Sequence, residues 1–227
     1  FVTGKPHFVN HAMMTADHGE GYAAVSCYNS LKIGGGAHTL VRLNLFEAVQ
    51  RHEGGLDAFI ADALPAWVEL ACELGEARIR ALVEGSGFFE SNFLATERLV
   101  DIDRFSAMFG IFGLAECVNE LMVRQGRPEA RYGHDDAANV ASYRITEAIA
   151  DLVAARPMPY CEGYGGRADL QSQSGIDLDL NATAGTRIPI GDEPDLREHI
   201  MTVAPHHRLF AAGISDIMHV DSTVERN

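Results

Sequence analysis

The chain has 227 residues, of which 47% are hydrophobic, so it can bury a substantial core and is too apolar to be disordered. Asp and Glu number 32 against 18 Lys and Arg, and the resulting formal charge of −14 argues against a nucleic-acid-binding surface. No apolar stretch approaches the length of a membrane span, so we expect a cytoplasmic protein. Because the chain starts at Phe1 without a methionine, we expect a fragment of a larger protein.

The first 54 residues are rich in Gly and His and contain two candidate strands. The apolar run 22–28 is long enough for one buried strand, and the glycine-rich turn 34–36 follows it. Residues 39–49 begin with strand-like alternation and then become apolar. This pattern predicts a second strand that finishes as a helical turn and lies beside the first.

Residues 56–83 carry apolar side chains at helical spacing, with Pro65 expected to bend or restart the helix. Their predicted apolar stripe is Phe59, Ile60, Ala63, Leu64, Trp67, Leu70, Ala71 and Leu74. Residues 105–125 are apolar on both faces and then turn helical, which predicts a strand followed by a helix.

Residues 135–155 give the clearest helical pattern, with Asp135 or Asp136 as the N-cap. We expect this helix to pack on the outside of a parallel sheet. Its expected buried side chains are Val140, Ile145, Ile149 and Leu152. Short apolar pieces follow at 176–180, 188–190 and 208–214 among Gly- and Asp-rich loops. The alternation of strands and helices predicts an α/β fold with a largely parallel sheet.

Four cysteines, Cys27, Cys72, Cys117 and Cys161, show neither the pairing of metal ligands nor the density of a disulfide scaffold. Composition alone favours a buried structural role for Cys27. A reactive role requires a tight loop with room for close backbone approach, which the three glycines nearby can provide. Cys72 is expected to be packing in a covering helix, and Cys161 lies in a loop that could face an active site.

Three blocks resemble glycyl radical enzymes related to anaerobic (class III) ribonucleotide reductase. Residues 24–45 (AVSCYNSLKIGGGAHTLVRLNL) look like the reductase segment in which the thiyl cysteine precedes a glycine-rich turn and an "NL" strand end. Residues 109–116 (FGIFGLAE) are similar to the family's "IGFIGLAE" stretch, and residues 204–213 (APHHRLFAAG) to its "APYH…LxNGG" block. Residues 11–22 (HAMMTADHGEGY) look like the YjjI-type branch.

The resemblance implies that residues 1–227 are a fragment of one catalytic barrel domain, a ten-stranded β/α barrel without its N-terminal part and its C-terminal glycyl-radical loop. Cys27 matches the thiyl-radical cysteine, which abstracts hydrogen from a substrate C–H bond. The implied cofactor is a glycyl radical on a residue outside this chain, with none bound in this fragment. The implied partners are a small-molecule substrate and a radical-SAM activase with an iron–sulfur cluster, in a homodimer, with no nucleic acid and no membrane.

The polar residues and glycines around these blocks are candidates for substrate binding, although loop capping is the commoner role for any one of them. They are Asn29, Gly34, Gly35, Gly36, His38, Glu116 and Asn119, and less securely Asp17, His18 and Asn181. The glycines could form a main-chain nest for a triphosphate. His38 stands where the reductases carry asparagine, which weakens the case for a ribonucleotide. Cys117, at the start of a helix, is the alternative radical cysteine.

Two other functions remain open. His7 and His11 are four apart, and His18, His206 and His207 could join them in a metal-dependent enzyme, although Pro6 and the glycines nearby favour a loop there. A barrel that has lost its activity and serves as a binding protein is the second alternative.

Overall fold

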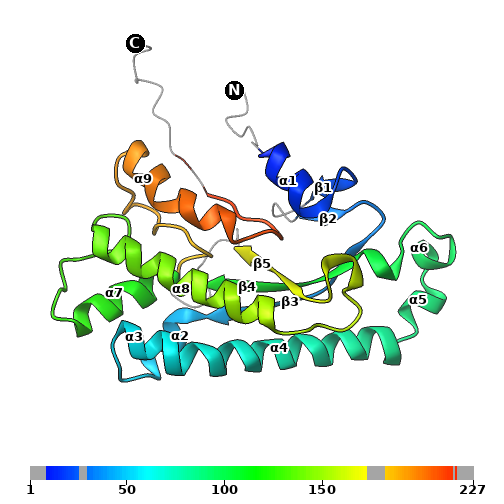
Figure 1. Cartoon of the computed structure of the whole chain (residues 1–227), viewed down its shortest axis with the longest axis horizontal. Helices are drawn as coiled ribbons and strands as arrows, with labels where there is room; N and C mark the ends of the chain where they lie inside the picture. The colour runs from blue at the N-terminus through cyan, green and yellow to red at the C-terminus, as the bar shows by residue number, and fades with distance from the viewer. Residues whose placement is uncertain (1–8, 26–29, 173–181, 217, 219–227) are drawn as a thin grey trace, which may run out of the picture.

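The computed structural model describes residues 9–25, 30–172, 182–216 and 218, and a parallel sheet lies at its centre (Figure 1). The strands β3 (Gly36–Asn44), β4 (Phe105–Phe112) and β5 (Ala168–Ser172) form the sheet in the order β3-β4-β5. Seven of the eight residues of β4 are buried, which suits a central strand covered on both faces.

Helices that follow the strands cover one face of the sheet. β3 runs directly into α2 (Leu45–Gln50), where the Asn44 side chain caps the helix by accepting the Glu47 N–H at 3.1 Å. β4 is followed after one residue by α7 (Leu114–Arg124). The long helix α8 (Asp136–Ala155) is capped by Asp135, which accepts the N–H groups of residues 137 and 138 at 2.8 and 3.2 Å.

A helical path from residue 56 to residue 85 crosses the same face. It consists of α3 (Leu56–Ala58), a π-helical turn (Phe59–Ala63), α4 (Leu64–Arg80) and a second π-helical turn (Ala81–Gly85). Pro65 lies in the first turn of α4, directly after the π-helical turn. The sequence predicts a bend or restart there, and the path changes from π-helical to α-helical geometry at this point without leaving the helix.

The hydrophobic core lies between the sheet and these helices. The strands contribute alternate residues that pair in register, Val41 with Phe109 and Leu43 with Ile111, and Leu170 of β5 extends the Phe109 row. The helices contribute Leu45, Phe59, Leu64, Ile79, Leu114, Leu121, Ile145 and Ile149.

Smaller elements lie around this centre. α1 (His11–His18) and the antiparallel hairpin of β1 (Tyr22–Ala24) and β2 (Ser30–Lys32) lie on the side of the sheet away from α4 (Figure 1). α5 (Phe88–Ser91) and α6 (Phe93–Thr96) connect α4 to β4. α9 (Leu196–Val203) continues into a 3-10 turn (Ala204–Arg208).

These elements confirm the α/β architecture with a parallel sheet. They also confirm the strand-to-helix units at 36–50 and 105–124 and the helix capped by Asp135. The described residues show a three-stranded parallel sheet with its helices, and the ten-stranded barrel stays a prediction.

Two predicted helix faces are correct only in part: Ile145 and Ile149 of α8 are buried as predicted, and so are Phe59, Leu64 and Ala71 of the α4 path. Val140 is 60% exposed because it lies five residues before Ile145 and hence roughly 140° around the helix. Leu152 is only half-buried. On α4, Leu70 and Leu74 are 56% and 52% exposed. The π-helical turn before α4 has wider hydrogen-bonded turns than an α-helix, so it shifts the buried face onto Val68, Ala71, Cys72, Gly75 and Ile79.

The predicted N-terminal strand also differs from the structure. β1 has three residues, none of them buried, and β3 pairs with β4 rather than with the first strand. The doubly apolar β4 provides a buried partner for β3, which the short exposed hairpin cannot. Among the late apolar pieces, 188–190 forms no strand and Ile190 is 71% exposed, whereas Gly213 makes a single parallel bridge to Gln171. The piece at 176–180 lies outside the described residues.

Candidate functional site

The second face of the sheet carries the polar side chains of Arg42, Asn44, Asp169 and Gln171. Strand register places Leu40, Met108 and Asp169 in one row across this face. The next row holds Arg42, Gly110 and Gln171, and Asn44 pairs with Phe112 beyond it. Because side chains alternate along a strand, all of these point away from the core on the helix side. We call these eight residues the polar sheet face.

The β1–β2 hairpin covers the amino half of the polar sheet face. β2 contacts both β3 and β4, and the Lys32 N–H donates to the Tyr164 hydroxyl at 2.9 Å. The Ser30 N–H donates to the Ala212 carbonyl at 2.8 Å, and the Ala212 N–H donates to the Leu170 carbonyl at 2.9 Å. Ser30 follows the segment 26–29 directly in the chain. Backbone hydrogen bonds through Ala212 therefore connect Ser30 to Leu170 of β5.

The segment 26–29 contains Cys27 and Asn29, which lie outside the described residues, as does Asn181. The thiyl-radical role that the resemblance implies for Cys27 therefore stays a prediction. Residues on either side of the segment, Ala24 and Ser30, line a pocket of about 130 Å³ together with parts of α1 and of residues 207–214.

Arg42 extends along the carboxyl half of the polar sheet face. A Cβ on Gly110 would lie 2.8 Å from the Arg42 Cγ and 3.4 Å from the Gln171 Oε1, so the glycine provides the space that both side chains use. The Arg42 guanidinium carbon lies 5.8 Å from the centre of the Phe112 ring. Arg42, Gly110 and Gln171 are not among the candidate residues of the sequence analysis. The strand-like alternation of residues 40–45 indicates that Arg42 lies on the face opposite the core.

Asp169 is the titratable group of the amino half. Burial raises the pKa of its carboxyl to about 6, and the charge of Asp17 adds to this, whereas His18 and Lys32 lower the pKa. His18 is buried and its Nε2 lies 2.8 Å from the Ala211 carbonyl oxygen. The structure therefore gathers two of the less secure candidates, Asp17 and His18, around a carboxyl that the sequence analysis did not select.

The three glycines lie at the amino edge of the sheet, where Gly36 pairs with Phe105. A Cβ on Gly35 would collide with the Arg104 carbonyl oxygen, and the Gly35 N–H donates to the Lys32 carbonyl at 3.0 Å. The glycines thus allow two backbones to approach closely, and the N–H of Gly35 is already used.

His38 lies at a β-bulge, since the register with β4 shifts between residues 37 and 39. Its Nε2 lies 2.8 Å from the Tyr160 carbonyl oxygen, and its ring centre lies 5.0 Å from that of Phe105. Burial lowers the pKa of His38, and the bond to Tyr160 opposes this. These contacts give His38 a packing role at the amino edge.

Glu116 and Asn119 lie beyond the other end of the sheet, on α7. Glu116 Oε1 accepts the Thr183 N–H at 3.0 Å and also the Thr183 hydroxyl, and Asn119 Oδ1 accepts the Tyr132 N–H at 2.8 Å. Both side chains therefore hold neighbouring loops. The eight residues of β4 span about 23 Å, so the structure does not bring this pair together with His38 and the glycines. A substrate-binding role for any of them stays a prediction.

The three described cysteines all belong to the core between the sheet and the helices. Burial raises the pKa of Cys72 to about 11 and that of Cys161 to about 12, and it raises the pKa of Cys117 as well. Cys72 packs in α4 as predicted. Raised pKa values make all three poor nucleophiles at neutral pH.

The late histidines serve the packing of the chain. His206 is buried with its Nδ1 2.9 Å from the Thr146 hydroxyl and its Nε2 3.2 Å from the Ser142 hydroxyl, and burial lowers its pKa to about 4. In the part of the chain that the structure describes, no three His, Cys, Asp or Glu side chains are grouped to hold a metal ion. His7, the first member of the histidine alternative, lies outside that part.

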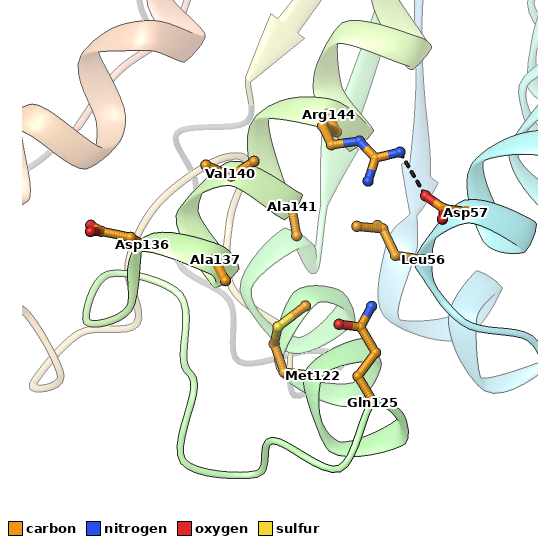
Figure 2. A pocket seen from close by; sticks show the side chains of 9 residues that line it. All are labelled: Leu56, Asp57, Met122, Gln125, Asp136, Ala137, Val140, Ala141 and Arg144. Carbon is orange, nitrogen blue, oxygen red and sulfur yellow. Dashed lines mark hydrogen bonds and ion pairs between the residues drawn. The ribbon is translucent and has the colours of Figure 1, made fainter.

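A pocket of about 710 Å³ lies on the helix-covered side, away from the polar sheet face. Figure 2 shows it between α3, α7 and α8, with Met122 and Gln125 on one wall. An ion pair of 2.7 Å between Arg144 and Asp57 crosses one edge of this pocket. Among the described residues, no helix is long and apolar enough to cross a membrane.

The whole chain, residues 1–227, matches the family model described as "Glycyl radical enzyme YjjI-like". It is 46% identical over 224 residues to "Uncharacterized protein YjjI" of Escherichia coli (strain K12). It is also 33% identical over 225 residues to an "Uncharacterized protein" of Haemophilus influenzae (strain ATCC 51907 / DSM 11121 / KW20 / Rd). Each match covers 98% of this chain and 43% of the relative, so the chain spans less than half the length of these relatives.

Two solved structures share the fold. One is the anaerobic ribonucleotide reductase from Thermotoga maritima with citrate in the active site, with a TM-score of 0.59 over 79% of this chain and 34% of that chain. The other, described as an anaerobic ribonucleotide reductase, has a TM-score of 0.61 over 85% of this chain and 32% of that chain. Both are 13% identical, so the likeness is one of fold. These findings confirm the resemblance carried by the three sequence blocks, and the chain belongs to the YjjI-like glycyl radical enzyme family.

Proposed function

We propose that this chain is the segment of a glycyl radical enzyme that carries its thiyl-radical cysteine, and that this cysteine is Cys27. The observation that carries the proposal is the anchoring of the neighbouring residue Ser30 to β5 beside the polar sheet face. Ala24 and Ser30, on either side of the segment 26–29 in the chain, line a pocket of about 130 Å³.

The other three cysteines support the proposal by their positions. Cys72, Cys117 and Cys161 are packed into the core on the opposite side of the sheet, among apolar side chains. A hydrogen atom moves only between groups in van der Waals contact, so a cysteine in that core has no access to a substrate on the polar sheet face. A thiyl radical also needs no lowered pKa, because the reacting group is S–H rather than a thiolate.

In the proposed reaction, Cys27 Sγ carries the unpaired electron and takes a hydrogen atom from a substrate C–H bond. One C–H bond breaks, one S–H bond forms, and the unpaired electron passes to the substrate carbon. A glycyl radical on a residue outside this chain would supply the unpaired electron to Cys27. The enclosing barrel would exclude water and oxygen from the intermediates.

The proposal extends to the whole protein. The parallel sheet described above forms part of the ten-stranded barrel, and the protein works as a cytoplasmic homodimer. A radical-SAM activase with an iron–sulfur cluster installs the radical. The substrate is a small molecule. The radical can be tested without knowing which one.

The test uses the full-length protein, activated anaerobically in D₂O and examined by electron paramagnetic resonance. The Cys27 thiol exchanges its hydrogen with solvent and shares it reversibly with the radical-bearing glycine. Deuterium therefore replaces the glycine α-hydrogen, and the doublet splitting of the glycyl signal collapses. We expect collapse in the wild type and in the control Cys72→Ser, whereas Cys27→Ser should form the radical and keep its doublet, because its O–H bond is too strong to break.

Collapse in Cys27→Ser together with a persistent doublet in Cys117→Ser would show that Cys117 is the radical cysteine. If no glycyl signal forms in any variant, including the wild type, after treatment with the activase, the radical mechanism itself is wrong for this protein.

A further inference from the structure

We infer that Arg42 binds an anionic group of the substrate, so that the substrate is a small carboxylate or phosphate ester. This inference deepens the proposed function and rests on it, because it assumes that the reaction takes place over the polar sheet face. It assigns a ligand-binding role to a residue that lies within the block 24–45 but is not among the candidate substrate-binding residues.

The geometry of Arg42 directs its charge to the carboxyl edge of the sheet. The aliphatic part of the side chain crosses Gly110, where a Cβ would lie 2.8 Å from Cγ. The guanidinium carbon then lies 5.8 Å from the ring centre of Phe112, which is the last residue of β4. In parallel α/β folds, whether the sheet is open or closed into a barrel, ligands bind at the carboxyl ends of the strands, so the charge of Arg42 is held where a ligand would arrive.

The charge of Arg42 is also unpaired within the described residues. No carboxylate there forms an ion pair with Arg42, whereas Arg51, Arg80, Arg124 and Arg156 each have a glutamate partner. Asn44, the neighbouring polar side chain of β3, uses its Oδ1 to cap α2. Arg42 therefore presents a planar set of N–H donors that matches the oxygens of a carboxylate or phosphate.

Electrostatics favour a local role for this arginine. A formal charge of −14 repels anions at long range, so an anionic substrate requires a specific cation inside the site. Once the remaining strands enclose the polar sheet face, an unpaired guanidinium is costly, and a bound oxyanion offsets that cost. The competing arrangement is a permanent ion pair between Arg42 and an acid elsewhere in the full-length protein.

The test measures binding to the full-length protein before activation, by isothermal titration calorimetry. The probes are succinate and inorganic phosphate, with uncharged succinamide as the matched negative control. Arg42→Gln removes the charge and keeps a polar side chain of similar length. Arg51→Gln is the control variant. Arg42 and Arg51 are both exposed, and the Arg51 guanidinium carbon lies 6.0 Å from the ring centre of Trp67, but Arg51 follows α2 in the helix layer.

We expect the wild type to bind succinate or phosphate but not succinamide, and Arg42→Gln to weaken that binding by at least roughly tenfold. Arg51→Gln should bind as the wild type does, and Arg42→Lys should restore part of the affinity. The preferred probe distinguishes a carboxylate substrate from a phosphate ester.

Two results would overturn the inference: failure of the wild type to bind either anion at millimolar concentration, or equal binding by the wild type and Arg42→Gln. A variant that loses thermal stability without any change in anion binding would point to the permanent ion pair. None of these measurements needs the radical, so they are independent of Cys27. In the D₂O experiment, Arg42→Gln should show the same collapse of the glycyl doublet as the wild type.

Discussion

At the scale of single residues, Asp169 shows how burial and nearby charges compete. The sheet register places its carboxyl beside Met108, under the β1–β2 hairpin. Burial raises the pKa from its ordinary value of 3.8 to about 6 despite the nearby His18 and Lys32. A carboxyl with this pKa is stabilised in its protonated form by the folded protein.

We predict that Asp169→Asn stabilises the fold at neutral pH. Because the folded pKa lies above the unfolded one, the unfavourable contribution of the wild-type carboxyl is absent below pH 3.8 and complete above about pH 6. The asparagine variant should gain at most about 3 kcal/mol at pH 7. Urea unfolding between pH 4 and pH 7 measures this.

The matched control for Asp169→Asn is Asp62→Asn on the exposed side of the π-helical turn 59–63. Equal pH dependence of unfolding in Asp169→Asn and the wild type would contradict the assignment of the shift to Asp169.

At the scale of elements, α8 shows that a recognisable helix can have an unexpected buried face. Its buried side chains are Ala138, Ala141, Ser142, Ile145, Thr146, Ile149 and Val153. This face includes two hydroxyl groups, which a search for apolar spacing passes over. Ser142 and Thr146 are buried because they bond to backbone carbonyls of their own helix and to His206.

We predict that Ile149→Ala lowers the free energy of unfolding by about 2–5 kcal/mol, because it removes a fully buried side chain from the core. Val140→Ala, on the exposed side of the same helix, should change it by less than about 0.5 kcal/mol. Urea unfolding followed by circular dichroism compares the two variants. A larger loss for Val140→Ala would mean that this side of α8 is covered in solution.

At the scale of the whole molecule, His206 joins the C-terminal segment to the helix layer. It comes from the turn after α9, and it contacts Ser142 and Thr146 of α8. Burial holds its pKa at about 4, so the folded protein keeps this imidazole neutral. The attachment of residues 196–208 to α8 therefore depends on pH.

We predict a loss of stability as the pH falls from 6.5 to about 4. The folded pKa of His206 lies below the unfolded one, so its contribution is complete above pH 6.5 and lost as protons bind the unfolded chain. The total loss is about 3 kcal/mol. His206→Met should remove this part of the pH dependence, since both hydroxyls keep their helix carbonyls as partners.

The sequence by itself determined the family, the α/β class, both strand-to-helix units and the position of α8. These features depend on hydrophobic periodicity, cap residues and contiguous motif blocks. Each of these signals lies within a short stretch of the sequence and needs no contact with a distant segment. The roles proposed for Gly34–Gly36 could not be judged in this way, since the collision that explains Gly35 is with the backbone of Arg104, in the 3-10 turn before β4.

Only the tertiary structure decided which strands pair and what shares the polar sheet face. Arg42, Gly110 and Gln171 come from three separate strands, and their meeting depends on parallel register between segments far apart in the chain. The π-helical turn 59–63 determines which side of α4 is buried. The hydrogen bond of His206 to Thr146 contributes to the burial of the polar side of α8. Register, helical phase and the pKa of Asp169 all follow from packing between distant segments, and local sequence patterns do not encode that packing.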